Sequence, residues 1–488
     1  MIVLYSILSL LVVVFFVCII VGFRVESRFK KENKIVKEEK FQYSSDKETE
    51  ERMVENLQKA LKFKTIAENC LNDKKEFDNF HASLEKCFPL VYQTLKVQEI
   101  AGKNLCFEWK GTDSSQKPIL LMAHQDVVNA GDLSKWKFPP FDAVIDGDYL
   151  YGRGTIDIKS QLIAILECFE TLIRKGFKPK NTIFASFAED EEIFGKGGES
   201  LAQYFKERKL EFKMVLDEGG AVAEDFLSII EKPIAVVGVS EKTTVNLKLE
   251  VNQEGGHSST PDNPTSLGIL SHAISALELK QEKSSITPPM GDFLLRIGCN
   301  TKGFISLAML NPWLFKGALF AIMKKNSTTS ALFRNTHTVT MCKGSDASNI
   351  IPVVSTANVN VRLLPNNSIE DTISWMKKII NDERVSISVS QEGEKSSVSN
   401  YKCEEFKIVE KTIAETFGDV LTFPYLLAGG TDARHFHGLS DKVYRFSPFM
   451  VTKSELSRMH NYNERISLEN IKRLPSFYIR LIQHFDET

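Results

Sequence analysis

Two adjacent carboxylates, Glu191 and Glu192, stand in the segment FASFAEDEEIFGKGG, where an apolar run ends in a glycine-rich loop. The apolar run predicts a buried strand, and neighbouring side chains of an extended chain point in different directions. One carboxylate of the pair can therefore bind a metal ion while the other faces a water molecule beside it. Taken alone, acidic triplets are typical of solvated loops, so the chemical interpretation depends on the other polar residues.

Further candidate ligands stand where other apolar runs end. In LMAHQDVV, His124 and Asp126 are two residues apart, which places both side chains on one face of an extended chain. Asp157 begins a predicted helix in LYGRGTIDIKS, Asp217 ends the apolar run in VLDEGG, and His460 stands in RMHNYNE. Each alone has an ordinary structural explanation, such as a helix cap for Asp157. Together with the acidic pair they form a mixed nitrogen and oxygen set that suits zinc.

The elements that must position these residues alternate from about residue 51 onward. KPILLMAH, KNTIFASFAE and FKMVLDEGG predict strands, and SQLIAILECFETLIRKG and GGESLAQYFKERK predict the helices between them. This order predicts an α/β fold with a mixed, mostly parallel sheet flanked by helices. Binding sites in such sheets form beyond the carboxyl ends of the strands, which is where the candidate ligands stand.

The pattern changes near residue 240. TTVNLKLEV and TANVNVRLL alternate apolar and polar residues, which predicts half-exposed strands, and TSLGILSHAISALELK predicts a helix. The chain of 488 residues is long for one hydrophobic core. We therefore expect a catalytic domain over 51–239 that resumes over 397–488, with a smaller α+β domain inserted over 240–396.

The first 23 residues contain no charged side chain and match the length of about 20 residues that crosses a bilayer. They exceed the roughly 7–15 apolar residues of a signal peptide and lack a clear cleavage site, which favours a retained anchor over a cleaved signal. Residues 24–50 are polar and predict a tether. Basic residues after the span favour a cytosolic flank, whereas the sequons at Asn326 and Asn366 matter only in a lumenal or extracellular domain.

Composition narrows the function further. With 43% hydrophobic and 25% charged residues, the chain has the composition of a globular protein. The net charge of -2 leaves no basic footprint, so we expect no nucleic-acid partner. The eight cysteines are scattered without CxxC spacing, which predicts neither a disulfide framework nor a cysteine zinc site. One disulfide in an oxidising compartment remains open.

Nine segments, in this order, resemble the di-zinc metallopeptidase superfamily of carboxypeptidase S, the aminoacylases, acetylornithine deacetylase and succinyl-diaminopimelate desuccinylase. The resemblance covers roughly residues 50–488. PIAVVGVSEKTTVNL, LNPWLF and KVYRFSPF indicate the branch of carboxypeptidase S and the N-fatty-acyl-amino-acid synthase/hydrolase. The nine segments are MAHQDVV, YGRGTIDIKS, EDEEIFGKGG, VLDEGG, GGHSSTP, SNIIPVV, VNVRLLP, GGTDARHF and HNYNE.

The resemblance implies two zinc ions as cofactors, bridged by Asp157. His124 and Asp217 would complete one zinc site, and Glu192 and His460 the other. A bridging carboxylate offsets the repulsion between two cations roughly 3.5–4 Å apart, and the shared water becomes the nucleophile.

The resemblance also implies that Glu191 is the general base, which takes the proton of the water and returns it to the leaving nitrogen. Asp126 would orient His124. The departures from the family pattern are Asn461 in place of Gly, Ile158 in place of Asp or Met, and Asn129 in place of Pro. None of them removes a ligand or the base, so they affect fine specificity alone.

On the substrate side, the resemblance implies that His257 in NQEGGHSSTPDNP reaches the active site of its own or a partner subunit and stabilises the oxyanion. A homodimer through the inserted domain is therefore expected. Asn349 and Arg362 resemble residues that hold the substrate, and an arginine fork suits the carboxylate of an N-acyl amino acid; a structural ion pair is the alternative for Arg362. A carboxylate-binding loop is the last resemblance, with residues Gly430, Thr431, Asp432 and Arg434, of which Arg434 has an equally good structural explanation.

The segment ISLAMLNPWLFKGALFAIM is unusually apolar for an inserted domain. Its large side chains are candidates to line a groove for a long acyl chain. A buried helix or a dimer contact explains them equally well. These candidates are Trp313, Phe315, Leu319, Phe320 and Met323.

The sequence thus predicts a zinc-dependent hydrolase that cleaves, and in reverse forms, the amide bond of an N-acyl amino acid, with an N-fatty-acyl amino acid as the expected substrate. A carboxypeptidase acting on short peptides is the alternative enzyme. A non-catalytic binding protein on the same fold would hold zinc without turnover. We expect a place in the secretory pathway, on the lumenal or extracellular face, with the N-terminal helix in the membrane, or secretion if that segment is cleaved.

Overall fold

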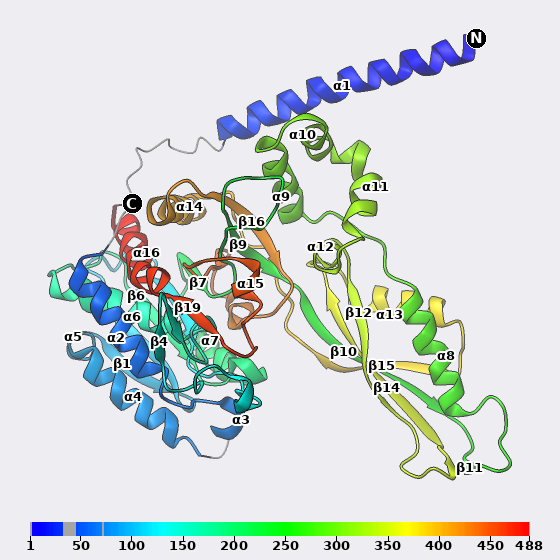
Figure 1. The fold of residues 1–488 in the computed structure, drawn as a ribbon, viewed down its shortest axis with the longest axis horizontal. Helices are drawn as coiled ribbons and strands as arrows, with labels where there is room; N and C mark the ends of the chain where they lie inside the picture. Colours follow the sequence, from blue (N-terminus) through cyan, green and yellow to red (C-terminus); the bar gives the residue numbers. More distant parts are fainter. Residues whose placement is uncertain (1, 33–44, 71–72, 488) are drawn as a thin grey trace. The chain divides into compact units, whose positions relative to one another are not determined.

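The computed structural model describes residues 2–32, 45–70 and 73–487. The chain forms two compact units, each with its own sheet (Figure 1). Part of the predicted tether, 33–44, lies outside the described residues. The larger unit comprises Ser27–Val239, Ser399–Tyr425 and Thr431–Thr488, and the smaller unit comprises Met1–Glu26, Ser240–Val398 and Leu426–Gly430.

A ten-stranded mixed sheet forms the centre of the larger unit. Four neighbouring strands, β6, β3, β7 and β17, run parallel. The strands next to them, β2 and β9, are antiparallel to them, and at the far edge β18 is parallel to β8. The predicted α/β class with a parallel centre is confirmed. The order is β1 (Lys96–Ile100), β2 (Asn104–Trp109), β6 (Ile183–Ala188), β3 (Ile119–His124), β7 (Met214–Asp217), β17 (Val443–Arg445), β9 (Ile234–Glu241), β8 (Val222–Ala223) and β18 (Met450–Val451), and β16 (Leu421–Leu427) pairs with β9.

Helices cover both faces of this sheet, as β3 illustrates. Ile119 and Leu121 pack into the apolar cluster under one layer of helices, whereas Leu120 and Met122 pack into the cluster on the opposite face. All six residues of β3 are buried, which explains its unbroken apolar sequence. The first layer is α2 (Lys47–Ala60), α6 (Lys159–Arg174), α14 (Glu404–Phe417) and α16 (Leu468–Glu487), and α7 (Gly197–Glu207) covers the other face.

Shorter elements complete the larger unit. A three-stranded antiparallel sheet holds the segment before the Asp157 turn. The elements are α3 (Ala67–Cys70), α4 (Lys75–Cys87), α5 (Pro89–Thr94) and α15 (Lys453–Leu456), the 3-10 helices η1 (Leu133–Lys135), η2 (Glu191–Ile193) and η3 (Asp432–Phe436), and the small sheet of β4 (Val144–Asp146), β5 (Tyr149–Tyr151) and β19 (Arg465–Ser467).

The smaller unit is built on a four-stranded antiparallel sheet in the order β12-β14-β10-β15. Burial alternates along β10 and β14, as the sequence predicted, because one face of the sheet packs under α8 and α13. The elements are β10 (Thr243–Asn252), β11 (Gly256–His257), β12 (Thr336–Lys343), β13 (Ile350–Ile351), β14 (Val354–Leu363), β15 (Val385–Glu392), α8 (Ser266–Leu279), α9 (Pro288–Cys299), α10 (Gly303–Leu310), α11 (Pro312–Met323), α12 (Ser327–Ala331) and α13 (Ile369–Ile380).

The predicted N-terminal anchor lies on helix α1 (Ile2–Glu32), most of which falls in the smaller unit. Among the residues that the structure describes, no single helix is long and apolar enough to cross a membrane. The consecutive helices α10 and α11 together reach that length and apolarity, but the chain bends by 114° between them. The anchor therefore stays a prediction.

Candidate metal and catalytic site

The parallel strands bring the candidate ligands to one edge of the central sheet. His124 of β3 pairs with Ala188 of β6, and Leu121 of β3 pairs with Leu216 of β7. The segments that follow β3, β6 and β7 consequently share the carboxyl edge of the sheet. These are the segments that carry the candidate ligands, so the expected meeting of the strand ends is present.

The two carboxylate oxygens of Asp157 face different imidazoles. Oδ1 lies 3.0 Å from Nε2 of His124, and Oδ2 lies 2.8 Å from Nε2 of His460. Burial alone would raise the pKa of Asp157, but the hydrogen bonds to the two imidazoles hold it well below its usual value. A carboxylate with one oxygen beside each of two nitrogen ligands has the position that a bridging ligand requires.

Glu192 completes this group beside His460. Its Oε2 lies 3.0 Å from Nε2 of His460, and hydrogen bonds to Asp157 and Glu192 raise the pKa of His460 to about 10. Ligand atoms of His124, Asp157 and Glu192 all lie within 4.8 Å of one another. The structure therefore brings together four of the five predicted metal ligands.

The fifth position is held by Glu218 and not by its neighbour Asp217. Oε1 of Glu218 lies 3.3 Å from Nε2 of His124, and these two residues form a second candidate ligand group with Glu191. Oδ2 of Asp217 instead accepts a hydrogen bond from the backbone N–H of Ala433 at 2.9 Å. Because neighbouring side chains at a strand end point to opposite sides, one acid faces the ligands and the other faces away. The structure thus places Glu218 where the sequence analysis had placed Asp217.

Glu191 lies against the same group of ligands. Burial raises the pKa of Glu191 well above its ordinary value, with the positive charge of His124 opposing and the negative charges of Glu218 and Asp432 adding to the rise. A carboxylate with a raised proton affinity is suited to accept and return a proton near neutral pH. The role of base, which the resemblance implied, stays a prediction.

Asp126 connects His124 to the acidic pair. Nδ1 of His124 donates to the backbone oxygen of Asp126 at 3.0 Å, and Oδ1 of Asp126 is 3.2 Å away. This leaves Nε2 of His124 as the nitrogen that faces the carboxylates. The carboxylate of Asp126 also accepts the backbone N–H groups of Glu191 at 3.2 Å and Glu192 at 3.0 Å. The sequence predicted the first contact but not the second.

The glycine-rich loop after the acidic pair wraps around Asp190. The carboxylate of Asp190 accepts the backbone N–H groups of Lys196 at 3.0 Å and Gly197 at 2.8 Å. A Cβ at Gly195 would lie 2.0 Å from this carboxylate, so a side chain there would collide with it. The loop sequence thus serves to hold the turn that presents Glu191 and Glu192.

Glu464 is a site residue that the sequence analysis missed. It is fully buried, and its Oε1 accepts the backbone N–H groups of Ile156 at 2.8 Å and of Gly154 at 3.1 Å, while its Oε2 accepts Nη1 of Arg153 at 2.6 Å. A further hydrogen bond of 3.3 Å joins it to the backbone N–H of Asp157. Glu464 therefore fixes the turn that presents Asp157. The sequence signal that could have identified Glu464 is its place in the HNYNE segment, four residues after His460.

The charges of this region fit divalent metal ions. Burial raises the pKa of Glu192, and it raises the pKa of Glu218 to about 8, with neighbouring carboxylates such as Asp157 adding to both shifts. Buried carboxylates that repel one another are stabilised by cations among them. Imidazole nitrogens and carboxylate oxygens are ligand atoms that such cations bind in proteins.

The predicted carboxylate-binding loop has contacts within itself. The side chain of Thr431 accepts the backbone N–H of Ala433, and Nη1 of Arg434 donates to the backbone oxygen of Thr431 at 2.8 Å. Nη2 of Arg434 lies 3.6 Å from Oδ1 of Asp432, and burial raises the pKa of Asp432 to about 7. These contacts favour the structural explanation of Arg434.

The remaining predicted substrate contacts lie in the smaller unit: His257, Asn349, Arg362 and Gly430. Two of them, His257 and Asn349, belong to neighbouring strand segments. His257 on β11 stands opposite β13, and the backbone N–H of Ser258 donates to the backbone oxygen of Asn349 at 3.1 Å. Arg362 on β14 donates from Nη1 to Oγ1 of Thr244 at 2.5 Å and from Nε to Oδ1 of Asn360 at 3.2 Å. Both of these partners are uncharged, and the negative charge of Glu241 acts on the guanidinium.

The five candidates for an acyl groove do not share one orientation. Leu319 is buried, and the ring of Phe320 packs against Phe333 at 6.1 Å between ring centres. Trp313, in contrast, is 57% exposed, and Phe315 packs on the exposed ring of Phe304. This part of α11 therefore has an inner and an outer side.

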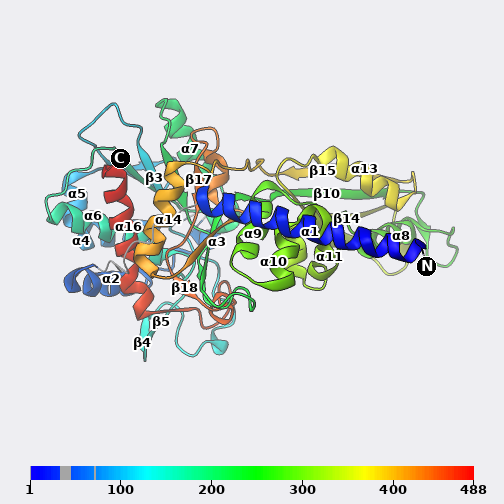
Figure 2. The same ribbon diagram turned by 90° about the horizontal axis from the view of Figure 1, so that it is seen from above.

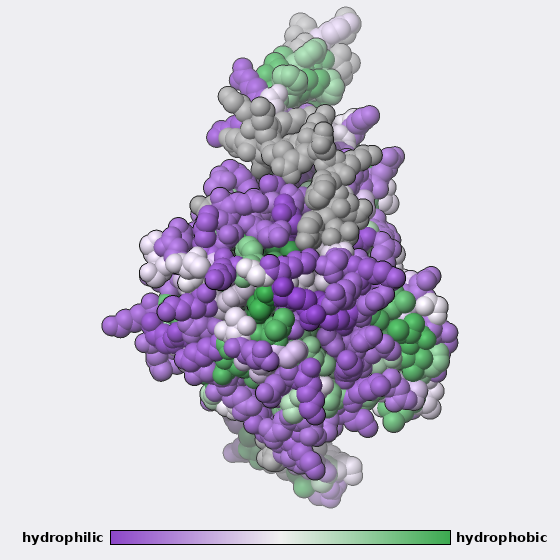
Figure 3. All heavy atoms as spheres, turned by 90° about the vertical axis from the view of Figure 1, so that its left-hand side faces the viewer, coloured by the Kyte–Doolittle hydropathy of each residue, from purple (hydrophilic) through white to green (hydrophobic). Residues whose placement is uncertain are grey.

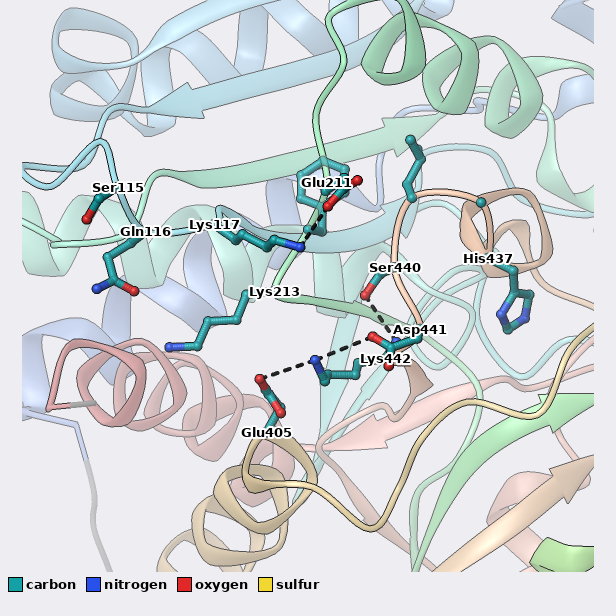
Figure 4. Close-up of a pocket in the computed structure, with 13 residues that line it drawn as sticks. Ser115, Gln116, Lys117, Glu211, Lys213, Glu405, His437, Ser440, Asp441 and Lys442 are labelled. Atoms are coloured by element: carbon teal, nitrogen blue, oxygen red, sulfur yellow. Dashed lines mark hydrogen bonds and ion pairs between the residues drawn. The ribbon is translucent and has the colours of Figure 1, made fainter.

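A cavity of about 530 Å³ opens elsewhere on the larger unit (Figure 4). Three lysines border the cavity, and each stands one or two residues before a parallel strand: Lys117 before β3, Lys213 before β7 and Lys442 before β17. The cavity thus lies at the edge where the parallel strands begin, opposite the edge that carries the ligands. Its lysines are engaged, for example Lys117 with Glu211 at 2.7 Å. It is not the metal site.

His437 borders this cavity and is held neutral. Burial and the charge of Arg445 lower the pKa of His437 to about 3, and Nη2 of Arg445 donates to its Nε2 at 3.3 Å. In the unfolded chain a histidine titrates near pH 6.5, so below that pH the unfolded state binds a proton that the folded state does not. The free energy of unfolding should therefore fall as the pH decreases from about 6.5 toward 3.

The variant His437→Gln removes this proton uptake. Its melting temperature should decrease less than that of the wild type when the pH is lowered from 7 to 5, as differential scanning calorimetry would measure. Equal decreases in the two proteins would contradict the assignment of a neutral, half-buried His437.

Comparison with known proteins agrees with this geometry. The model of "Peptidase family M20/M25/M40" matches residues 120–484. The chain is 36% identical over 448 residues to "Probable carboxypeptidase S-like 2" of Dictyostelium discoideum, covering 89% of this chain and 85% of the relative. It is 32% identical over 472 residues to "N-fatty-acyl-amino acid synthase/hydrolase PM20D1" of Homo sapiens, covering 95% of this chain and 90% of the relative.

Among solved structures, the fold is similar to an "M20 family metallo-carboxypeptidase Sso-CP2 from Sulfolobus solfataricus", with a TM-score of 0.65 and 19% identity over 91% of this chain and 100% of that one. Human carnosine dipeptidase 1 has a TM-score of 0.58 at 14% identity, covering 89% of this chain and 96% of that one. At these identities the structures show a shared fold. With the matched family model, the relatives and the clustered ligands together, the chain is an enzyme of the metallopeptidase and amidohydrolase type that belongs to peptidase family M20/M25/M40.

Proposed function

We propose that this protein is a di-zinc amidohydrolase that splits N-fatty-acyl amino acids into a fatty acid and an amino acid, and that also joins the two in the reverse direction. The observation that carries the proposal is the buried group of imidazoles and carboxylates with Glu191 beside it. The relatives that are called N-fatty-acyl-amino acid synthase/hydrolase, at 31–35% identity, support the substrate class.

Five side chains would hold the two ions. Asp157 would be shared by both, His124 and Glu218 would complete one set of ligands, and Glu192 and His460 would complete the other. Two bound zinc ions supply Lewis acidity, which polarises the amide carbonyl and lowers the pKa of a water molecule.

Glu191 carries the proton in the proposed reaction. Its carboxylate accepts a proton from the attacking water and delivers it to the amide nitrogen, so that the amine can leave. The backbone hydrogen bond from Glu191 to Asp126 keeps this carboxylate beside the ligands. Asp126 thereby positions both the base and His124.

Arg362 is proposed to bind the carboxylate of the amino-acid half. Burial lowers the pKa of Arg362, but a guanidinium remains charged at neutral pH. Its present partners are a hydroxyl and an amide oxygen. A carboxylate would offer the guanidinium a stronger, charge-assisted pair of hydrogen bonds.

We also propose a homodimer, because Arg362 and His257 stand far apart on the smaller unit. Arg362 and Val354 are eight positions apart on β14, which is about 26 Å at 3.3 Å per residue. His257 lies beyond the Val354 end of the sheet, since β10 continues through Asn252 toward β11. The carboxylate and the scissile carbonyl of an N-acyl amino acid are only a few bonds apart, so they cannot contact both residues of one copy, and His257 would serve the site of a partner copy.

Mixing two inactive variants tests the dimer. His257→Ala and Glu191→Gln should each be nearly inactive alone, whereas unfolding and refolding them together should restore roughly a quarter of the wild-type rate. Random pairing makes half of the dimers mixed, and each mixed dimer has one intact site. Failure of the mixture to exceed the activity of either parent would rule out a shared site.

The carboxypeptidase function is the second candidate. It is favoured by the similarity to "Carboxypeptidase S" of Saccharomyces cerevisiae, which is 29% identical over 473 residues, covering 85% of this chain and 81% of that relative. Hydrolysis of a panel of N-acyl amino acids and blocked dipeptides separates the two. A higher kcat/KM for N-oleoyl-phenylalanine than for a blocked dipeptide supports the fatty-acyl substrate, and the reverse order supports the carboxypeptidase.

For localisation, we propose that both units face the lumen or the exterior, anchored by α1, or secreted if that segment is cleaved. Asn326 and Asn366 are exposed, as glycan attachment requires. Glycosidase treatment of the protein from eukaryotic cells should therefore increase its electrophoretic mobility, and Asn326→Gln with Asn366→Gln should abolish the shift. A wild-type protein without any shift would oppose this orientation.

A further inference from the structure

Helices α10 and α11 of the smaller unit present large apolar side chains to solvent. The side of the molecule that faces the viewer in Figure 3, which is the left-hand side of Figure 1, is in contrast mostly hydrophilic, with hydrophobic residues in small groups. Apolar side chains gathered on two consecutive helices mark a binding surface. The α10–α11 face is defined as Phe304 (69% exposed), Ile305 (39%), Trp313 (57%), Leu314 (42%) and Ile322 (66%).

The charged side chains in the segment that carries the two helices are all basic. From residue 293 to residue 345, which includes both helices, the sequence contains no acidic residue. An apolar surface flanked by lysines matches a lipid surface, where the apolar side chains enter the headgroup region and the lysines meet the lipid phosphates. The exposed lysines on and beside the two helices are Lys302, Lys316, Lys324 and Lys325.

Helix α1 extends the apolar surface within the same unit, where it lies beside α10 (Figures 1 and 2). Asn311, between α10 and α11, donates from Nδ2 to the backbone oxygen of Cys18 at 3.1 Å. A Cβ on Gly22 would touch Asn311 and Leu310. The remaining sides of α1 carry exposed apolar residues, among them Val13, Phe16, Ile20 and Phe23.

The length of the two helices excludes a simple span. Their eight and 12 residues correspond to about 12 and 18 Å at 1.5 Å per residue, against a hydrocarbon core of about 30 Å. The bend of 114° also prevents them from acting as one rod. The buried amide of Asn311 at the bend is satisfied by the backbone oxygens of Cys18 and Leu307, as apolar surroundings require.

We propose that the α10–α11 face docks on the surface of a lipid bilayer, with its lysines at the lipid phosphates and α1 beside it. The continuity with the apolar sides of α1 favours a bilayer over a single acyl chain, and the clustered lysines favour a lipid surface over a second copy of the same cationic face. The proposal does not depend on the substrate. If the substrate is an N-fatty-acyl amino acid, docking brings the smaller unit to the phase into which such amphiphiles partition.

Trp313 allows a direct test with the full chain. The protein is reconstituted in nanodiscs of phosphatidylcholine, or of phosphatidylcholine with 30% phosphatidylserine, each with or without a doxyl-labelled lipid that quenches tryptophan on contact. The emission of Trp313 is the difference between the wild type and Trp313→Phe. The control is Trp375 on α13 of the same unit, measured as the difference between the wild type and Trp375→Phe.

We expect the doxyl lipid to quench Trp313 at least twofold more than Trp375, with stronger quenching when phosphatidylserine is present. Because Trp313 is exposed and phenylalanine is smaller, the fold should tolerate the change. Equal quenching of the two tryptophans would overturn the proposal. Equal quenching of Trp313 with and without phosphatidylserine would overturn the role of the lysines. Two results together would assign the face to a second copy: no quenching of Trp313 in the wild type, and loss of dimers in Trp313→Ser by mass photometry.

Discussion

Replacement of Glu191 by Gln is expected to lower kcat for amide hydrolysis by about 10²–10⁴-fold while the bound metal remains. The amide of Gln cannot accept the proton of the attacking water, yet it has nearly the same size as the carboxylate. The backbone N–H at this position still donates to Asp126, so the turn and the other ligands should keep their positions.

Metal content and turnover, measured on the same preparations, separate the two members of the acidic pair. Glu192→Gln should lose both activity and metal, since Glu192 contacts His460 within the ligand group. Glu207→Gln, an exposed change on α7, is the matched control and should lose neither. Undiminished turnover of Glu191→Gln would remove Glu191 from the role of base, and metal loss in that variant would mark it as a ligand.

Replacement of Glu218 by Gln is expected to weaken metal binding by at least about 10–100-fold, whereas the same test on Asp217 should change it little. Glu218 is the acid whose oxygen lies 3.3 Å from Nε2 of His124. In Asp217→Asn the amide oxygen can still accept the backbone N–H of Ala433, as the carboxylate of Asp217 does.

Competition with a zinc indicator on the two purified variants decides this point. The expected order of affinities is the wild type, close to Asp217→Asn, and then Glu218→Gln. If Asp217→Asn loses its metal and Glu218→Gln keeps it, the ligand assignment at the end of β7 is wrong.

The sequence was sufficient to predict the elements that carry the site. Apolar runs of six or so residues between amphipathic helices have the length and composition of buried strands in an α/β sheet, and β3 and β6 follow that pattern. In the smaller unit, strict alternation predicted β10 and β14. Order along the chain also placed His124 and the acidic pair at strand ends.

The remainder depended on which way individual side chains point. Asp217 and Glu218 are adjacent acids, and the pairing of β7 with β3 and β17 decides which of them faces His124. Contacts across long sequence separations were also hidden. Glu464 reaches the Asp157 turn from more than 300 residues away, with side-chain oxygens that local sequence cannot connect. The outward side of α11 likewise became visible once Leu319 and Trp313 were placed on opposite sides.

The central claim is that amide hydrolysis requires metal ions in the group around Asp157. The most direct test follows hydrolysis of N-oleoyl-phenylalanine while a chelator removes the metal and zinc is then returned in measured amounts. The account predicts that the metal-free protein is inactive and that activity recovers fully as zinc approaches two ions per chain. Hydrolysis that continues in protein shown by elemental analysis to hold no metal would contradict it.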